Sequence, residues 1–122
     1  MKRLHRLALT AAAITLGGGI ASAHPLPQNA SPKPNAVLTA SPTEIRIGFS
    51  EGLVIAFSGI EVDDARGKAV PAGTATLDAS DSHELIVPLT TKLAPGTYTV
   101  KWHAVGDDTH RVTGHYSFAV KD

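Results

Sequence analysis

The feature that most constrains the fold is an alternation of apolar and polar residues with a period of two. It recurs in five stretches of the chain, at 44–49, 57–64, 83–89, 97–105 and 115–120. In the fourth of these, Tyr98, Val100 and Trp102 alternate with polar residues. Such alternation places the apolar side chains on one face of an extended strand. No sustained helical period accompanies it, so the pattern predicts an all-β domain.

The expected strands are short and are separated by Gly and Pro, which is typical of a small antiparallel sandwich or barrel. The Pro-Gly pair at 95–96 precedes Tyr98 and resembles the tyrosine corner of Greek-key sandwiches, although an ordinary turn before a core tyrosine explains it equally well. Four prolines between residues 24 and 35 favour an extended start to the domain. The least hydrophobic interior stretch, 63–84, is expected to run through loops.

Residues 1–23 contain the three parts of a secretory signal: a basic start, an apolar centre and the small residues Ala21-Ser22-Ala23. A membrane anchor is the alternative, but this stretch is rich in Ala and Gly, whereas a spanning helix needs about 20 strongly apolar residues. We therefore expect cleavage between Ala23 and His24 and export of the mature chain. The mature part, 24–122, has the length of one domain, with no membrane insertion after processing.

The composition of the mature part excludes several functions. The chain has no Cys, so thiolate metal sites, disulfides and thiol chemistry are ruled out. Lys2, Arg3 and Arg6 fall in the signal segment, which leaves eight basic residues against 11 acidic ones and a formal charge of −3. Nucleic-acid binding depends on clustered Lys and Arg, so this balance argues against it. A core of about 100 residues can form without disulfides.

Three residues are candidate metal ligands. Cleavage after Ala23 would give His24 a free α-amine beside its imidazole, and both nitrogens can bind the same ion. Asp108 and His110 are two apart, which puts both side chains on one side of an extended segment. Three nitrogens and one oxygen favour Cu(II) in a tetragonal plane, and copper binds more tightly than Zn(II), which would take similar ligands in a tetrahedron. Pro25 has no N–H for Cu(II) to displace, although it also serves as a stiffener.

On these residues the mature chain resembles the CopC/YobA family of periplasmic copper-binding proteins. The resemblance covers nearly all of 24–122 and rests on the amino-terminal HP, the FSE at 49–51, the PGTYTVxWxAVxxDTH pattern at 95–110 and the TG…F.V ending. It implies a small Greek-key β-barrel related to the immunoglobulin sandwich. It also implies that Cu(II) is bound by the amine and ring of His24, by Asp108 and by His110, and that a CopD-type membrane protein receives the copper.

The chain departs from the founding type of this family, which also binds Cu(I) through a methionine-rich loop. The matching region, 63–81, has no Met, and the only methionine of the chain is Met1. Cu(I) is a soft ion that prefers thioether or thiolate ligands. We therefore expect one Cu(II) per chain and no methionine-based Cu(I) site.

The other histidines carry weaker signals. His5 leaves with the signal segment, and His103 faces away from the apolar side of its strand. His83 lies in a polar turn and His115 follows the candidate loop by five residues. Both are expected at the surface, with assistance to the metal as the alternative. Asp107 is expected to face away from the site.

The favoured function is non-catalytic: the protein sequesters, buffers or delivers Cu(II) by chelation. An alternative is a copper monooxygenase with a histidine brace, because an amino-terminal histidine bound through amine and ring is also the centre of those enzymes. The short chain and its few aromatic residues argue against an enzyme, and Asp108 would stabilise Cu(II) against reduction. The third hypothesis, a metal-free immunoglobulin-like interaction module, would leave the position of His24 as a coincidence.

Overall fold

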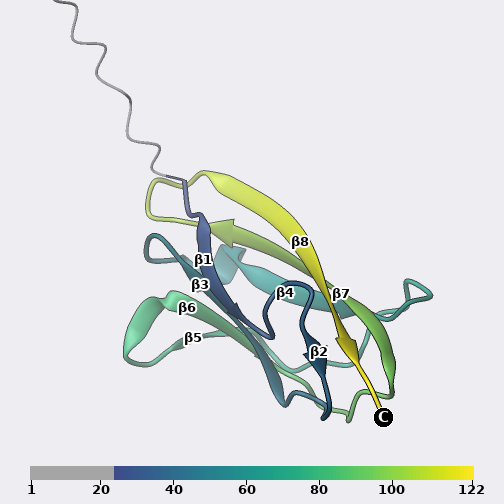
Figure 1. Ribbon diagram of the computed structural model, residues 1–122. Helices are drawn as coiled ribbons and strands as arrows, with labels where there is room; N and C mark the ends of the chain where they lie inside the picture. Colours follow the sequence, from purple (N-terminus) through teal and green to yellow (C-terminus); the bar gives the residue numbers. More distant parts are fainter. Residues whose placement is uncertain (1–23) are drawn as a thin grey trace, which may run out of the picture.

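The protein is a sandwich of two four-stranded β-sheets (Figure 1). The structure, a computed structural model, describes residues 24–122, so the expected signal segment lies outside the described residues. The first sheet has the strand order β1-β3-β6-β5. Its strands are β1 (Pro27–Ser31), β3 (Glu44–Phe49), β6 (Asp81–Pro88) and β5 (Thr76–Asp78).

The second sheet has the strand order β2-β8-β7-β4, and a short 3-10 turn, η1 (Ile55–Phe57), precedes β4. Its strands are β2 (Val37–Leu38), β8 (Arg111–Val120), β7 (Gly96–Val105) and β4 (Gly59–Asp63). All pairings are antiparallel except that of β2 with β8. The chain passes between the sheets several times, as in Greek-key and immunoglobulin-like sandwiches, so the predicted all-β fold class is confirmed.

The core lies between the two sheets and is built from the alternating residues. Each of the five stretches with a period of two coincides with a strand, and the apolar side chains of these strands face inward. Burial of this apolar surface is the main force that holds the sheets together. The strand residues of this hydrophobic core are Ile45, Ile47, Phe49, Ile60, Val62, Leu85, Val87, Tyr98, Val100, Trp102, Ala104, Phe118 and Val120.

The expectation of loops throughout 63–84 is wrong in part, because β5 and the first half of β6 lie in this stretch. β5 is a three-residue edge strand, too short to show a clear alternation. It is held partly by a polar contact, since Arg46 Nη1 lies 2.8 Å from Asp78 Oδ2 across the outer face of the sheet. The hydrogen bond from Arg46 holds the pKa of Asp78 well below its usual range, and Ser80 acts in the same direction.

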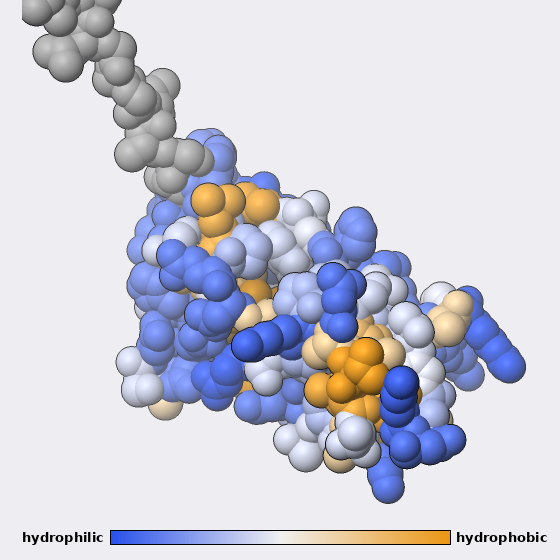
Figure 2. Space-filling model, viewed as in Figure 1, coloured by the Kyte–Doolittle hydropathy of each residue, from blue (hydrophilic) through white to orange (hydrophobic). Residues whose placement is uncertain are grey.

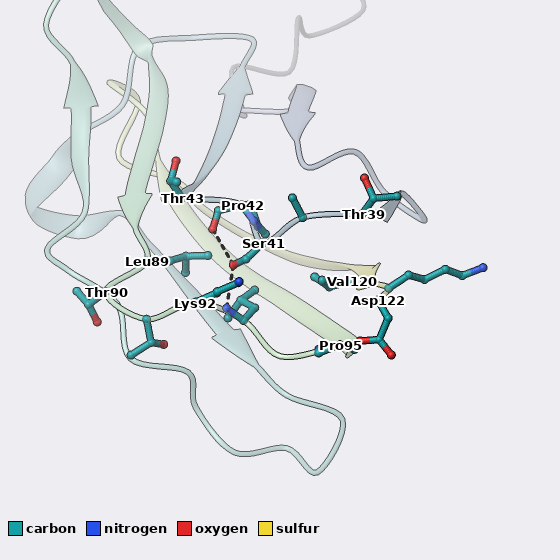
Figure 3. Close-up of a pocket in the computed structure, with 14 residues that line it drawn as sticks. Thr39, Ser41, Pro42, Thr43, Leu89, Thr90, Lys92, Pro95, Val120 and Asp122 are labelled. Carbon is teal, nitrogen blue, oxygen red and sulfur yellow. Dashed lines mark hydrogen bonds between the residues drawn. The ribbon is translucent and has the colours of Figure 1, made fainter.

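One end of the sandwich carries the loop between β7 and β8, and the other end carries a pocket. β7 and β8 pair along ten residues, from Gly96 opposite Val120 to Val105 opposite Arg111. The loop between them therefore lies at one end, beside the start of the described chain (Figure 1). A pocket lined by residues 39–43, 89–93 and 120–122 lies at the other end (Figure 3).

The surface is mostly hydrophilic on the face shown in Figure 2. Apolar surface gathers over β2 and the end of β8, where Val37 is 56% exposed. None of the helices in residues 24–122 is long and apolar enough to cross a membrane.

The Pro-Gly turn before β7 forms a tyrosine corner. The hydroxyl of Tyr98 donates a hydrogen bond to the carbonyl of Ala94, four residues upstream, at 2.5 Å. The ring of Tyr98 stacks on that of Phe118, with the ring centroids 5.6 Å apart. Tyr116 offers a contrast, because its hydroxyl is buried without a hydrogen-bond partner among the described residues, and this burial raises the pKa of Tyr116 to about 12.

The two tyrosines make a matched pair for a stability test. Tyr98→Phe should lower the free energy of unfolding by about 1 kcal/mol, because the carbonyl of Ala94 loses its donor. Tyr116→Phe removes a buried hydroxyl that has no partner, and should leave the stability unchanged or raise it. Urea unfolding of both variants checks this expectation. A larger loss for Tyr116→Phe than for Tyr98→Phe would contradict it.

Candidate metal centre

The first candidate ligand, His24, lies on a short arm, residues 24–26, that leads into β1. Its side chain is exposed, whereas the ring of Pro25 is fully buried. The backbone N–H of Ser50 donates to the carbonyl of Leu26 at 2.8 Å, which extends the pairing of β1 with β3 beyond Pro27. The arm is therefore anchored to the first sheet at Leu26, two residues after His24.

The other two candidates, Asp108 and His110, lie in the loop between β7 and β8. The loop turns where Thr109 N–H donates to the carbonyl of Gly106 at 3.0 Å. One carboxylate oxygen of Asp108 accepts the backbone N–H of His110 at 3.1 Å. Thr109 has a φ of 68°, a left-handed conformation that β-branched residues rarely adopt. The two side chains thus converge through a turn, and not through the extended segment that their spacing suggested.

His24, Asp108 and His110 come together at this end of the sandwich. Each offers a ligand atom, and these atoms all lie within 4.8 Å of one another. The ring centroids of the two histidines are 4.9 Å apart, and Nδ1 of His110 lies 3.1 Å from Oδ2 of Asp108. Within residues 24–122 this is the one group of three such side chains with that geometry.

The electrostatics of the group favour an ionised carboxylate. Partial desolvation raises the pKa of Asp108, but the hydrogen bonds from the backbone and ring of His110 and the charges of both histidines outweigh it, so the pKa is lowered. Two imidazoles and a carboxylate suit Cu(II) or Zn(II) rather than Mg²⁺ or Ca²⁺, which prefer oxygen ligands alone. The α-nitrogen of His24 can join them only if the chain is cut before this residue.

Sequence reasoning treated Glu51 only as part of the FSE motif, and the structure gives it a place behind the loop. A Cβ atom at Gly106 would collide with the carboxylate of Glu51, so the glycine makes room for this side chain. Oε1 of Glu51 is buried and has no hydrogen-bond partner among the described residues. The side chain of Glu51 therefore packs against Gly106, the first residue of the loop that carries Asp108.

The remaining candidates stay outside the group of three. His83 is exposed, with Nδ1 3.1 Å from the carbonyl oxygen of Phe49. His103 packs over Gly59 on the outer face of the second sheet, and His115 is exposed on β8. Asp107 is exposed as well. None of these four belongs to the converging group.

A β-sandwich with nitrogen and oxygen ligands gathered at one end defines a small candidate metal-binding domain. The chain belongs to the CopC family, since the model of the CopC domain matches residues 28–121. YobA from Escherichia coli K12 is 43% identical over 90 residues, which cover 74% of this chain and 73% of that protein. Copper resistance protein C from Escherichia coli is 31% identical over 127 residues, 99% of this chain and all of that protein.

Two further comparisons bear on copper. The crystal structure of PcoC, a methionine-rich copper resistance protein from Escherichia coli, has a TM-score of 0.74 and 34% identity, and the match covers 81% of this chain and all of that one. Copper transport protein CutJ from Bacillus subtilis is 29% identical over 98 residues, which are 80% of this chain and 18% of that protein. The likeness to PcoC supports the sandwich fold and the family.

The Asp108 carboxyl gives a test of the site that needs no metal. In a carbon-13 NMR titration its pKa should lie below the usual range. His110→Ala should raise this pKa, because the ring contact at 3.1 Å is lost. The lowered pKa means that ionised Asp108 stabilises the fold above the ordinary carboxyl pKa, and that this contribution is lost as the pH falls through the folded value. An unchanged pKa in His110→Ala would show that the two side chains do not interact.

Proposed function

We propose that the mature protein begins at His24 and binds one Cu(II) ion per chain in the periplasm, for copper homeostasis or resistance. The ligands are the amine and imidazole of His24, the carboxylate of Asp108 and the imidazole of His110. The mechanism is chelation, with copper as cargo that the protein sequesters, buffers or delivers. We assign no catalytic step, in keeping with a family of copper-binding proteins.

The observation that carries this proposal is the convergence of three ligating side chains from two ends of the sequence within 4.8 Å. Two imidazoles and one carboxylate, with an amine next to one of the rings, make a set of three nitrogens and one oxygen. Such a set suits a tetragonal Cu(II) ion. The carboxylate also neutralises one of the two charges of the ion.

The choice of Cu(II) over Cu(I) rests on what the mature chain lacks. It has no Cys, and its only Met is Met1, in the segment that we expect to be removed. PcoC, by contrast, is a methionine-rich relative. Because Cu(I) prefers sulfur ligands, we expect only weak binding of Cu(I) here.

Pro25 supports the role that we give to the amine. Cu(II) at an amino terminus tends to displace the proton of the next backbone N–H and to bind that nitrogen. Proline has no such proton, so the ion is directed to the imidazole of His24 and onward to Asp108 and His110. The buried ring of Pro25 also fixes the direction in which this arm leaves β1.

A membrane protein of the CopD type is the proposed recipient of the copper. The match to CutJ supports a link to transport, because a domain similar to this chain makes up 18% of that copper transport protein.

The position of the amine can be tested with a variant that has one extra Gly before His24. Every side chain is kept, but the amine is moved away and an amide nitrogen takes its place. Cu(II) affinity should fall at least about 10-fold, the order of loss seen when supporting groups are removed from metal sites. His24→Ala should weaken binding more than Asp108→Ala, since it removes the ring and loosens the amine. Competition with a chelator of known affinity measures these changes.

Matched controls come from the histidines outside the group. His83→Ala and His103→Ala should leave the Cu(II) affinity close to that of the unaltered protein. If the extended protein binds Cu(II) as tightly as the processed one, the amine is not a ligand.

The number and kind of bound ions give a second test. Electron paramagnetic resonance of the copper-loaded protein should show one tetragonal Cu(II) with nitrogen and oxygen ligands per chain. The affinity should fall in acid, because protons compete for the amine and imidazole nitrogens. Two ions bound with equal affinity, or Cu(I) bound more tightly than Cu(II), would argue against the proposed site.

A further inference from the structure

The amino-terminal arm, residues 24–26, would become a chain terminus after cleavage. A chain terminus is usually poorly ordered unless contacts with the rest of the protein hold it in place. Once the chain is cut before His24, only three residues precede β1. His24 and Leu26 are exposed, and Leu26 is 54% exposed. A ligand on such an arm would lose much of its chelating strength if the arm moved freely.

Ser50, the residue that follows β3, ties this arm at two points of its backbone. Its backbone N–H donates to the carbonyl of Leu26 at 2.8 Å, and its hydroxyl oxygen accepts the N–H of Leu26 at 2.9 Å. The same hydroxyl lies 3.5 Å from the carbonyl oxygen of His24, toward which it can donate its own hydrogen. The side chain of Ser50 therefore bridges the peptide groups on either side of Pro25.

Pro25 is the third fixed point. Its ring is less than 2% exposed, although both neighbours are exposed. A buried ring with a fixed φ leaves the arm few directions in which to leave the sheet. The hydroxyl of Ser50 and the ring of Pro25 hold the backbone of 24–26, while the side chain of His24 stays free to face Asp108 and His110.

From these contacts we infer that Ser50 is a positioning residue of the copper site. Its hydroxyl holds residues 24–26 so that the nitrogens of His24 face the other ligands before the ion arrives. This inference rests on the proposed function, because it takes His24 to be a ligand. Ordering a ligand in advance strengthens binding, since less freedom is lost when the ion is bound. Loss of such supporting groups typically costs 10–100-fold in metal affinity.

The competing explanation is that the hydroxyl of Ser50 only stabilises the fold. Ser41 provides the matched control, because its hydroxyl makes the same kinds of contact at the opposite end of the sandwich (Figure 3). It accepts the backbone N–H of Leu93 at 2.8 Å and donates to the carbonyl of Pro42 at 3.2 Å. Its loss should affect the fold in a similar way without touching the arm.

The experiment compares Ser50→Ala, Ser50→Thr and Ser41→Ala in the protein that begins at His24. Ser50→Ala should bind Cu(II) about 10-fold more weakly. Its paramagnetic resonance spectrum should change, because the geometry around the ion is altered. Ser50→Thr keeps the hydroxyl and should restore both the affinity and the spectrum. Ser41→Ala should lower the unfolding midpoint but leave the affinity and the spectrum unchanged.

A readout without copper completes the test. The amide of Leu26 should exchange its hydrogen faster in Ser50→Ala than in the unaltered protein or in Ser41→Ala, since its acceptor is gone. The inference is overturned if Ser50→Ala binds Cu(II) like the unaltered protein, or if Ser41→Ala weakens binding equally. His24→Ala distinguishes a failure of the proposed copper function from a failure of the positioning role of Ser50. If it binds as tightly as the unaltered protein, the proposed function fails, whereas weak binding by His24→Ala together with normal binding by Ser50→Ala rejects only the positioning role.

Discussion

The pairing of β7 with β8 is the interaction on which the rest of the structure depends. It runs unbroken over ten residue pairs, so one face of this ribbon carries much of the core and its far end carries the Asp108–His110 turn. Trp102 lies opposite Gly114, where a larger residue would collide with the indole ring. The same pairing that buries Trp102 thus fixes where the two candidate ligands of the loop, Asp108 and His110, emerge.

The other half of the site depends on the first sheet. β1 pairs with β3, and Ser50 extends this pairing to Leu26, so the start of the domain is delivered to the end of the sandwich that carries the β7–β8 loop. Neither sheet holds the whole site. The packing of the two sheets brings His24 against His110, which couples formation of the site to the correct association of the sheets.

The sequence carried most of the information on the fold, and less on the local geometry of the site. The strict alternation of Ile45, Ile47 and Phe49 predicted β3, and a similar alternation predicted β7. β2 and β5 were not foreseen, because strands of two or three residues are too short to show a period. The approach of Asp108 to His110 was expected for the wrong reason. A threonine rarely adopts a positive φ, so a turn at Thr109 could not be read from its type. The proposed ligands were identified from sequence motifs. The contact between Ser50 and the arm could not be predicted in this way, because it depends on pairing between distant segments.

The central claim is that the site is completed only when the chain is cut before His24. Its most direct test is the amino-terminal sequence and intact mass of the protein recovered from the periplasm after export. The account predicts a chain that starts with His24-Pro25 and lacks residues 1–23. A chain that keeps any residue before His24, or that begins beyond it, would contradict the account, because the amine and imidazole could not then bind the same ion from one residue.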